Sequence, residues 1–214
     1  MTQPSAPRPA NIVLISAPFG PLTLPSLGLS LLKSAVLADN PEASVEVLYL
    51  TVKFAKQISP ELYSVITDGD STCNLLGEWL FADAVFPGRA GSTDYITNVL
   101  AFGETWTEEA GDGRRVLNEN LIRQLLGARD VVPAFIERSA ARIVSMSPDI
   151  IGFTSVFDQN LASLALARAV KELIPGTPII FGGSNCEGVM GQQIVKSFPW
   201  VDAAVSGGST TTGA

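Results

Sequence analysis

The sequence contains no histidine, and this absence excludes more chemistry than any other feature of its composition. Histidine is the commonest general base and transition-metal ligand, and it is the middle member of a Ser-His-Asp triad. Cys73 and Cys186 are the only cysteines, too few for an iron–sulfur cluster or a structural zinc site. Ordinary hydrolase chemistry is therefore a poor expectation, and the low cysteine content indicates a reducing cytoplasm.

Positive charge and long apolar runs are also scarce. Lysine and arginine number 14 against 21 acidic residues, and the net charge of −7 would repel a phosphate backbone. No apolar run approaches the roughly 20 residues that cross a bilayer, and residues 1–10 are Pro-rich and polar, unlike a signal peptide. We therefore expect a chain that binds neither nucleic acid nor membrane and that begins with a disordered leader over residues 1–10.

What the sequence does contain is a regular alternation of strand-like and helical patterns, with enough apolar residues (46%) to fill a large core. Short apolar runs predict five strands, at residues 11–16, 45–50, 149–154, 179–181 and 201–205. Helical spacing predicts helices at residues 25–38, 131–145, 160–173 and 191–198. This pattern predicts an α/β fold, a Rossmann-like (flavodoxin-like) parallel sheet of order 2-1-3-4-5 with helices on both faces.

The middle of the chain, residues 51–130, differs from the rest in composition and in hydrophobic pattern. Aromatic residues alternate there with glycines and acids, and no strand-like run recurs, so we expect a mainly helical insertion after the second strand. Gly111-Asp112-Gly113 is a candidate mobile loop within it. Trp79 and Trp106 are expected to pack on the sheet; their exposure would instead favour a partner surface. The domain is expected to span residues 11–207, followed by a flexible tail at 208–214.

Ligands of such sheets lie beyond the carboxyl ends of the strands, where the strand order reverses. Thr154 and Ser155 place two hydroxyls at the end of the third predicted strand, whereas Asp158 is expected to cap the following helix. Gly182 and Gly183 follow the fourth strand and expose bare backbone. Together these residues predict a slot for a long planar or tail-like ligand, which a bulky residue at Gly183 should block without disturbing the fold.

The loop after the first strand, residues 17–28, holds no acid or base and neither of the glycine-rich patterns that cradle nucleotide phosphates. An enzyme that grips a nucleotide by its phosphates is therefore disfavoured.

Several segments resemble the amino-terminal cobalamin-binding domain of cobalamin-dependent radical SAM enzymes of the ribosomal peptide maturation type. The most specific is Phe181-Gly-Gly-Ser-Asn-Cys-Glu-Gly188, supported by the segments 25–29, 77–81, 151–160 and 162–165. In that family a Ser/Thr after the third strand and a Gly-Gly after the fourth accommodate the nucleotide tail of cobalamin.

The resemblance implies that Thr154 and Ser155 meet the tail and that Gly182, Gly183 and Ser184 let it pass. Phe19, Gly20 and Leu22 would lie beneath the corrin ring. The remaining cofactor-binding residues implied by the resemblance are Val156, Phe157, Gln159, Asn185 and Gly207.

Two departures limit what the resemblance implies. The first-strand loop reads Ser16-Ala-Pro-Phe-Gly20 instead of the Asp-x-His-x-x-Gly of the methionine synthase type, so a bound cobalamin would lack a histidine ligand on its lower face. The chain also lacks the Cys-x-x-x-Cys-x-x-Cys motif, so SAM and a 4Fe-4S cluster would belong to a missing domain or a partner. The expected function is a non-catalytic cobalamin module for a radical SAM methyltransferase, with a peptide as a possible substrate; a fragment and a natural short protein fit equally.

Two other functions remain open. A flavodoxin-like interaction or regulatory domain without cobalamin would use the aromatic insertion as a partner surface. An enzyme in its own right would use Asp158, Glu187 or Cys186 as its reactive group, although neither a histidine nor a nearby lysine is present to activate the thiol.

Overall fold

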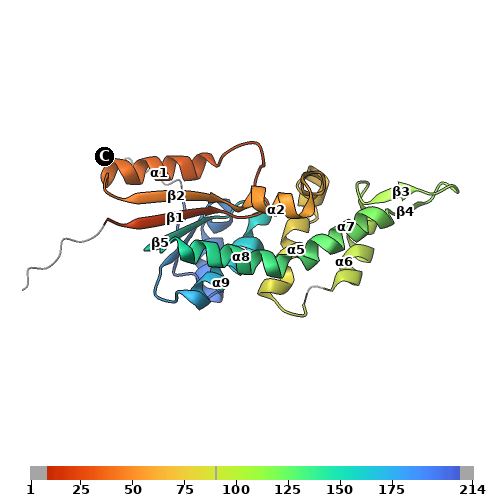
Figure 1. Cartoon of the computed structure of the whole chain (residues 1–214). Helices are drawn as coiled ribbons and strands as arrows, with labels where there is room; N and C mark the ends of the chain where they lie inside the picture. The colour runs from red at the N-terminus through yellow and green to blue at the C-terminus, as the bar shows by residue number, and fades with distance from the viewer. Residues whose placement is uncertain (1–8, 90, 208–214) are drawn as a thin grey trace, which may run out of the picture.

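A computed structural model describes residues 9–89 and 91–207 of the chain. Five parallel strands form one sheet of order β2-β1-β5-β6-β7 (Figure 1). This confirms the predicted doubly wound α/β class and strand order. The strands are β1 (Asn11–Ser16), β2 (Ser44–Tyr49), β5 (Ile150–Thr154), β6 (Ile179–Gly182) and β7 (Ala203–Ala204).

Helices cover both faces of the sheet. On one face lies α1 (Leu27–Asp39), which begins where the Ser26 hydroxyl accepts a hydrogen bond from the Leu29 N–H. On the opposite face lie α8 (Val132–Ser145) and α9 (Asn160–Leu173) (Figure 1). The connection between β6 and β7 is α10 (Val189–Ser197).

The alternation of side chains along each strand divides the core in two. Val13 and Ile15 of β1 belong to the larger cluster, whereas Leu14 between them packs with Leu29 of α1 in a smaller one. Farther along the α1 face, Ile180 and Gly182 are half-buried and Val205 is exposed. This face of the sheet is therefore less completely covered than the other.

The segment between β2 and α8 is mainly helical. Its helices are α2 (Leu50–Ile58), α3 (Pro60–Ile66), α4 (Gly69–Cys73), α5 (Leu76–Val85), α6 (Ser92–Asn98) and α7 (Glu119–Asp130), with a short 3-10 turn at Leu100–Phe102. A small antiparallel hairpin of β3 (Thr107–Glu109) and β4 (Arg115–Leu117) was not predicted, because three-residue strands rich in Glu and Arg carry no apolar alternation. Gly111-Asp112-Gly113 lies at its tip.

The aromatic residues of the insertion are core residues. Trp106 is fully buried, and Trp79 is buried with its ring stacked on Tyr95. Phe54 and Phe81 pack against each other and against Phe135 of α8. Both tryptophans are buried as expected, but the contacts given for them are with other residues of the insertion: Tyr95 and Arg129 for Trp79, and Ser71 for Trp106. Their burial removes the argument for a partner surface made by them.

The predicted leader lies outside the described residues except for residues 9 and 10, and the predicted tail lies wholly outside them. Within the described part of the chain, no helix is both long and apolar enough to traverse a bilayer.

Candidate functional site

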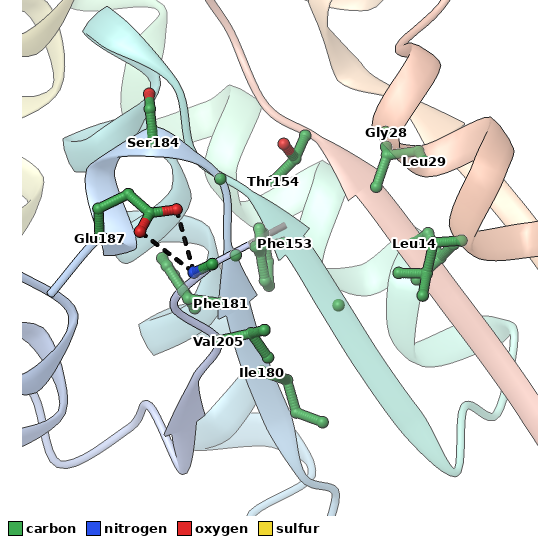
Figure 2. A pocket seen from close by; sticks show the side chains of 15 residues that line it. Leu14, Gly28, Leu29, Phe153, Thr154, Ile180, Phe181, Ser184, Glu187 and Val205 are labelled. Atoms are coloured by element: carbon green, nitrogen blue, oxygen red, sulfur yellow. Dashed lines mark hydrogen bonds between the residues drawn. The ribbon is translucent and has the colours of Figure 1, made fainter. Parts of the chain in front are cut away.

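A cavity of about 410 Å³ opens at the carboxyl ends of β5 and β6, on the face covered by α1. We call it the slot. Figure 2 shows Thr154 between Ser184 on one side and Gly28 and Leu29 on the other. The residues that line the slot are Leu14, Gly28, Leu29, Leu32, Gly152, Phe153, Thr154, Ile180, Phe181, Gly182, Gly183, Ser184, Glu187, Val205 and Gly207.

Small residues at alternate strand positions make room for the slot. Gly152 and Gly182 occupy paired strands and face the same side of the sheet. A Cβ on Gly152 would come within 2.9 Å of Leu14 Cδ2, so this glycine makes space for the leucine side chain. A Cβ on Gly182 would meet no atom within 4 Å and would project into open space. Gly182 is therefore a strand position at which a side chain can fill the slot.

Gly183 also lines the slot, but the packing of two loops requires a glycine at this position. Its φ is +100°, and a Cβ there would lie 2.5 Å from the carbonyl oxygen of Ser155. The prediction that a bulky residue at Gly183 would leave the fold intact is wrong, because such a residue would push the β6–α10 loop away from the β5–α9 loop.

Ser155 and Asn185 tie these two loops together. The Asn185 N–H donates to the Ser155 carbonyl (3.1 Å), and the Asn185 side-chain amide donates to Ser155 Oγ (3.0 Å) and to the Phe157 carbonyl (2.8 Å). Ser155 is fully buried, and neither it, Asn185 nor Val156 lines the slot. Among the hydroxyls predicted to meet a ligand, Thr154 is placed to do so and Ser155 is not.

Glu187 closes one end of the slot. Both oxygens of its carboxylate accept a hydrogen bond from the Gly207 N–H at 3.1 Å (Figure 2), and Ser206 Oγ donates to one of them at 3.2 Å. The sequence suggested Glu187 only as a reactive group. Its positioning role depends on a contact with residues 20 positions later, which no local pattern reveals.

A second cavity, also of about 410 Å³, lies beside the β1–α1 loop. We call it the loop cavity. Its lining residues are Phe19, Gly20, Pro21, Leu22, Thr23, Ser64, Thr67, Thr72, Phe157 and Asp158. The slot and the loop cavity share no lining residue. Phe19, Gly20, Leu22 and Phe157 thus line a different cavity from Thr154, Gly182, Gly183, Ser184 and Gly207.

Gln159 holds the β1–α1 loop by a hydrogen bond from its buried side chain. It is buried, and its side-chain amide donates to the Ala17 carbonyl at 2.6 Å. A Cβ on Gly20 would come within 2.9 Å of Gln159 Nε2, which explains the glycine at that position. Gln159 lines neither cavity and positions the loop that does.

The prediction that Asp158 caps α9 is wrong. Asp158 Oδ2 accepts a hydrogen bond from the Gly77 N–H of α5 at 3.1 Å. The first N–H groups of α9 are satisfied by Glu78, whose two oxygens accept from Asn160 (2.9 Å) and Leu161 (2.6 Å). A carboxylate from the insertion therefore caps α9 in place of a residue from its own loop.

The carboxyl groups of Glu78 and Asp158 both have raised pKa values. Burial raises the pKa of Glu78 to about 7, against the lowering effect of its two backbone hydrogen bonds, and the neighbouring Asp158 raises it further. Burial also raises the pKa of Asp158 to about 6, and the Gly77 hydrogen bond acts in the opposite direction. Desolvation outweighs hydrogen bonding at both groups.

Cys186 offers no activated nucleophile. Its side chain is fully buried, and burial together with the charge of Glu187 raises the pKa of the thiol. Among residues 9–89 and 91–207, no three acidic or thiol side chains lie close enough together to hold a metal ion.

Comparison of the chain with protein-family models, curated proteins and solved structures found no match. Function therefore has to be inferred from the two cavities and from the motifs that carry the resemblance.

Proposed function

We propose that the chain is a cobalamin-binding module whose slot receives the nucleotide tail of the cofactor. The observation that carries this proposal is the open space in front of Gly182, at the end of a buried strand and beside the Thr154 hydroxyl. An empty channel over a glycine at the carboxyl edge of a parallel sheet is where a doubly wound fold binds ligands.

The chemistry of the slot fits a nucleotide tail. Leu14, Leu29 and Ile180 form an apolar wall suited to an aromatic base. Thr154 and Ser184 bring hydroxyls that can bond a ribose or a phosphate. The contacts expected for the tail are therefore Thr154, Gly182, Ser184 and the backbone of Gly183 and Gly207.

The corrin ring would remain outside the slot, over the carboxyl ends of the strands. The first-loop residues Phe19, Gly20 and Leu22 stay the predicted neighbours of its lower face, and the sequence supplies no histidine to ligate cobalt there. When bound, cobalamin would supply a cobalt centre able to carry a methyl group. The chain itself would bind and orient the cofactor for a radical SAM methyltransferase domain or partner that acts on a peptide.

The test is a spectroscopic titration of the full chain with hydroxocobalamin. Native protein should bind one equivalent and give the spectrum of a corrinoid that has lost its lower base. Gly182→Leu should weaken binding at least tenfold, because its side chain fills the slot. Gly127→Leu on α7, where a Cβ also meets open space, is the matched control and should bind normally.

Absence of stoichiometric binding by the native protein would reject the proposal. Unchanged affinity in folded Gly182→Leu would also reject it, since the tail could not then occupy the slot.

An interaction or regulatory domain without cobalamin is the second candidate, and one observation favours it. Leu75, Phe157 and Met190 have exposed side chains and line one groove beside α10, the kind of apolar surface that binds other proteins. A purified protein that stays colourless and ignores hydroxocobalamin would favour this function over the first.

A further inference from the structure

The loop cavity contains a buried carboxylate that is only half satisfied. Asp158 is 3% exposed, and its Oδ2 accepts one backbone hydrogen bond from Gly77. Its Oδ1 is buried and has no hydrogen-bond partner among the described residues. Buried polar atoms are almost always paired, so an orphan carboxylate oxygen beside a cavity indicates a missing partner.

The described residues that line the loop cavity include no lysine or arginine that could compensate the charge of Asp158, and the chain has no histidine. Glu78 adds a carboxyl of the same charge nearby: burial raises its pKa most, and the charge of Asp158 raises it further. A buried carboxylate is costly unless a cation or several donors accompany it.

Two of the hydroxyls that line the cavity can serve a ligand only as acceptors. The hydroxyls of Ser64 and Thr67 already donate to backbone carbonyls of α3, at 2.9 Å to Pro60 and 3.0 Å to Tyr63. Their remaining lone pairs can only accept hydrogen bonds. Phe19 and Phe157 add aromatic surface, which attracts organic cations.

We infer that the loop cavity binds a primary ammonium group carried on a compact apolar body, with Asp158 as its counter-ion. An α-amino group or the side-chain amine of a small molecule or a peptide belongs to this class. The ammonium donates to Oδ1 of Asp158 and to hydroxyl oxygens of the cavity, and the apolar body packs on the two phenylalanine rings. The inference does not depend on cobalamin, because the slot proposed for the nucleotide tail is a separate cavity and the loop cavity is tested without the cofactor. Phe19, Gly20 and Leu22 line the loop cavity and are also the predicted neighbours of the corrin ring.

The test compares two probes that differ at one group, 2-phenylethylammonium and 2-phenylethanol. Their binding to the full chain is measured by calorimetry at pH 8 and low salt, where the Asp158 carboxylate is charged. The ammonium should bind at least tenfold more tightly than the alcohol, because charge-assisted hydrogen bonds are the strong ones. Asp158→Asn keeps an acceptor for the Gly77 N–H and should remove this preference.

A second pair of variants fills the cavity without touching the carboxylate. Ser64 is exposed at the rim of the cavity, and Ser64→Trp should abolish binding of both probes. Thr97 is also exposed on a short helix, and its hydroxyl likewise donates to the carbonyl four residues earlier, that of Thr93 (2.9 Å). Thr97→Trp should therefore bind both probes as the native chain does.

The inference is overturned if the native chain binds the two probes equally, binds neither, or keeps its ammonium preference in Asp158→Asn. Its failure is distinguishable from failure of the cobalamin proposal. Asp158→Asn should not change the hydroxocobalamin titration, and Gly182→Leu should not change the binding of 2-phenylethylammonium.

Discussion

The adjacent glycines at the end of β6 have opposite structural roles, and replacing each by alanine should separate them. Gly183 has φ +100° and ψ 177°, a region that only glycine populates readily. An alanine there costs about 1–3 kcal/mol in backbone strain. Its Cβ would also lie 2.5 Å from the Ser155 carbonyl oxygen, and at that distance one of the loops has to move.

That movement breaks further contacts. The Ser155 carbonyl accepts from the Asn185 N–H at 3.1 Å, and Ser155 Oγ accepts from the Asn185 side chain at 3.0 Å. Each such hydrogen bond contributes about 1 kcal/mol. Gly183→Ala should therefore lower the free energy of unfolding by about 3–5 kcal/mol, from backbone strain together with the two weakened hydrogen bonds.

Gly182→Ala is the internal control for this experiment. Its Cβ meets no atom within 4 Å, so the change in unfolding free energy should stay within about 0.5 kcal/mol. Urea unfolding followed by circular dichroism measures both variants against the native chain. Equal destabilisation of the two variants, or a stable Gly183→Ala, would refute the assignment of Gly183 to loop packing and of Gly182 to the slot.

Three further predictions concern the acidic side chains. Glu78→Ala should destabilise the chain by about 1–2 kcal/mol in urea unfolding, because α9 loses its cap, and Glu78→Gln should recover part of this by accepting one of the two N–H groups. The folded-state pKa of Glu78 (about 7) lies above its ordinary value of 4.5, so the folded chain holds this proton more tightly than the unfolded chain does. Stability should therefore fall as pH rises from 4.5 to 7, and Glu78→Gln should reduce the slope; an unchanged slope would contradict the assignment. Glu187→Ala should speed amide hydrogen exchange at Gly207, which loses its acceptor, and leave exchange at the centre of β1 unchanged.

Much of the fold follows from sequence periodicity. The strand at residues 11–16 and the helix at 160–173 have the predicted bounds, because buried strands and one-sided helices leave strong apolar patterns. The sequence predicts β7 over residues 201–205, but the strand is only two residues long, because only Ala203 and Ala204 pair with β6. The β3–β4 hairpin leaves no such pattern and could not be found.

The sequence predicts those residues of the candidate site whose place depends only on where a strand ends. Thr154 and Gly182 end paired parallel strands, so both lie at the carboxyl edge by topology alone. Local rules assign the cap of α9 to Asp158, but Glu78 caps this helix, and Asp158 instead accepts from Gly77. The capping carboxylate belongs to a residue 82 positions earlier in the chain. Contacts between residues so far apart in the sequence depend on how the insertion packs against the sheet domain. Local patterns in a single sequence do not predict this packing.

The short segment from the end of β5 to the start of α9 contributes residues to both cavities and to the contacts that hold the neighbouring loops. Thr154 faces the slot, Ser155 holds the loop after β6, Asp158 borders the loop cavity and Gln159 braces the first loop. The insertion fixes the far end of this segment through α5, by the Gly77 bond to Asp158 and the Glu78 cap on α9. The insertion is thus a structural part of the carboxyl edge of the sheet, because without α5 the loop that borders both cavities would lose the partners that hold its second half.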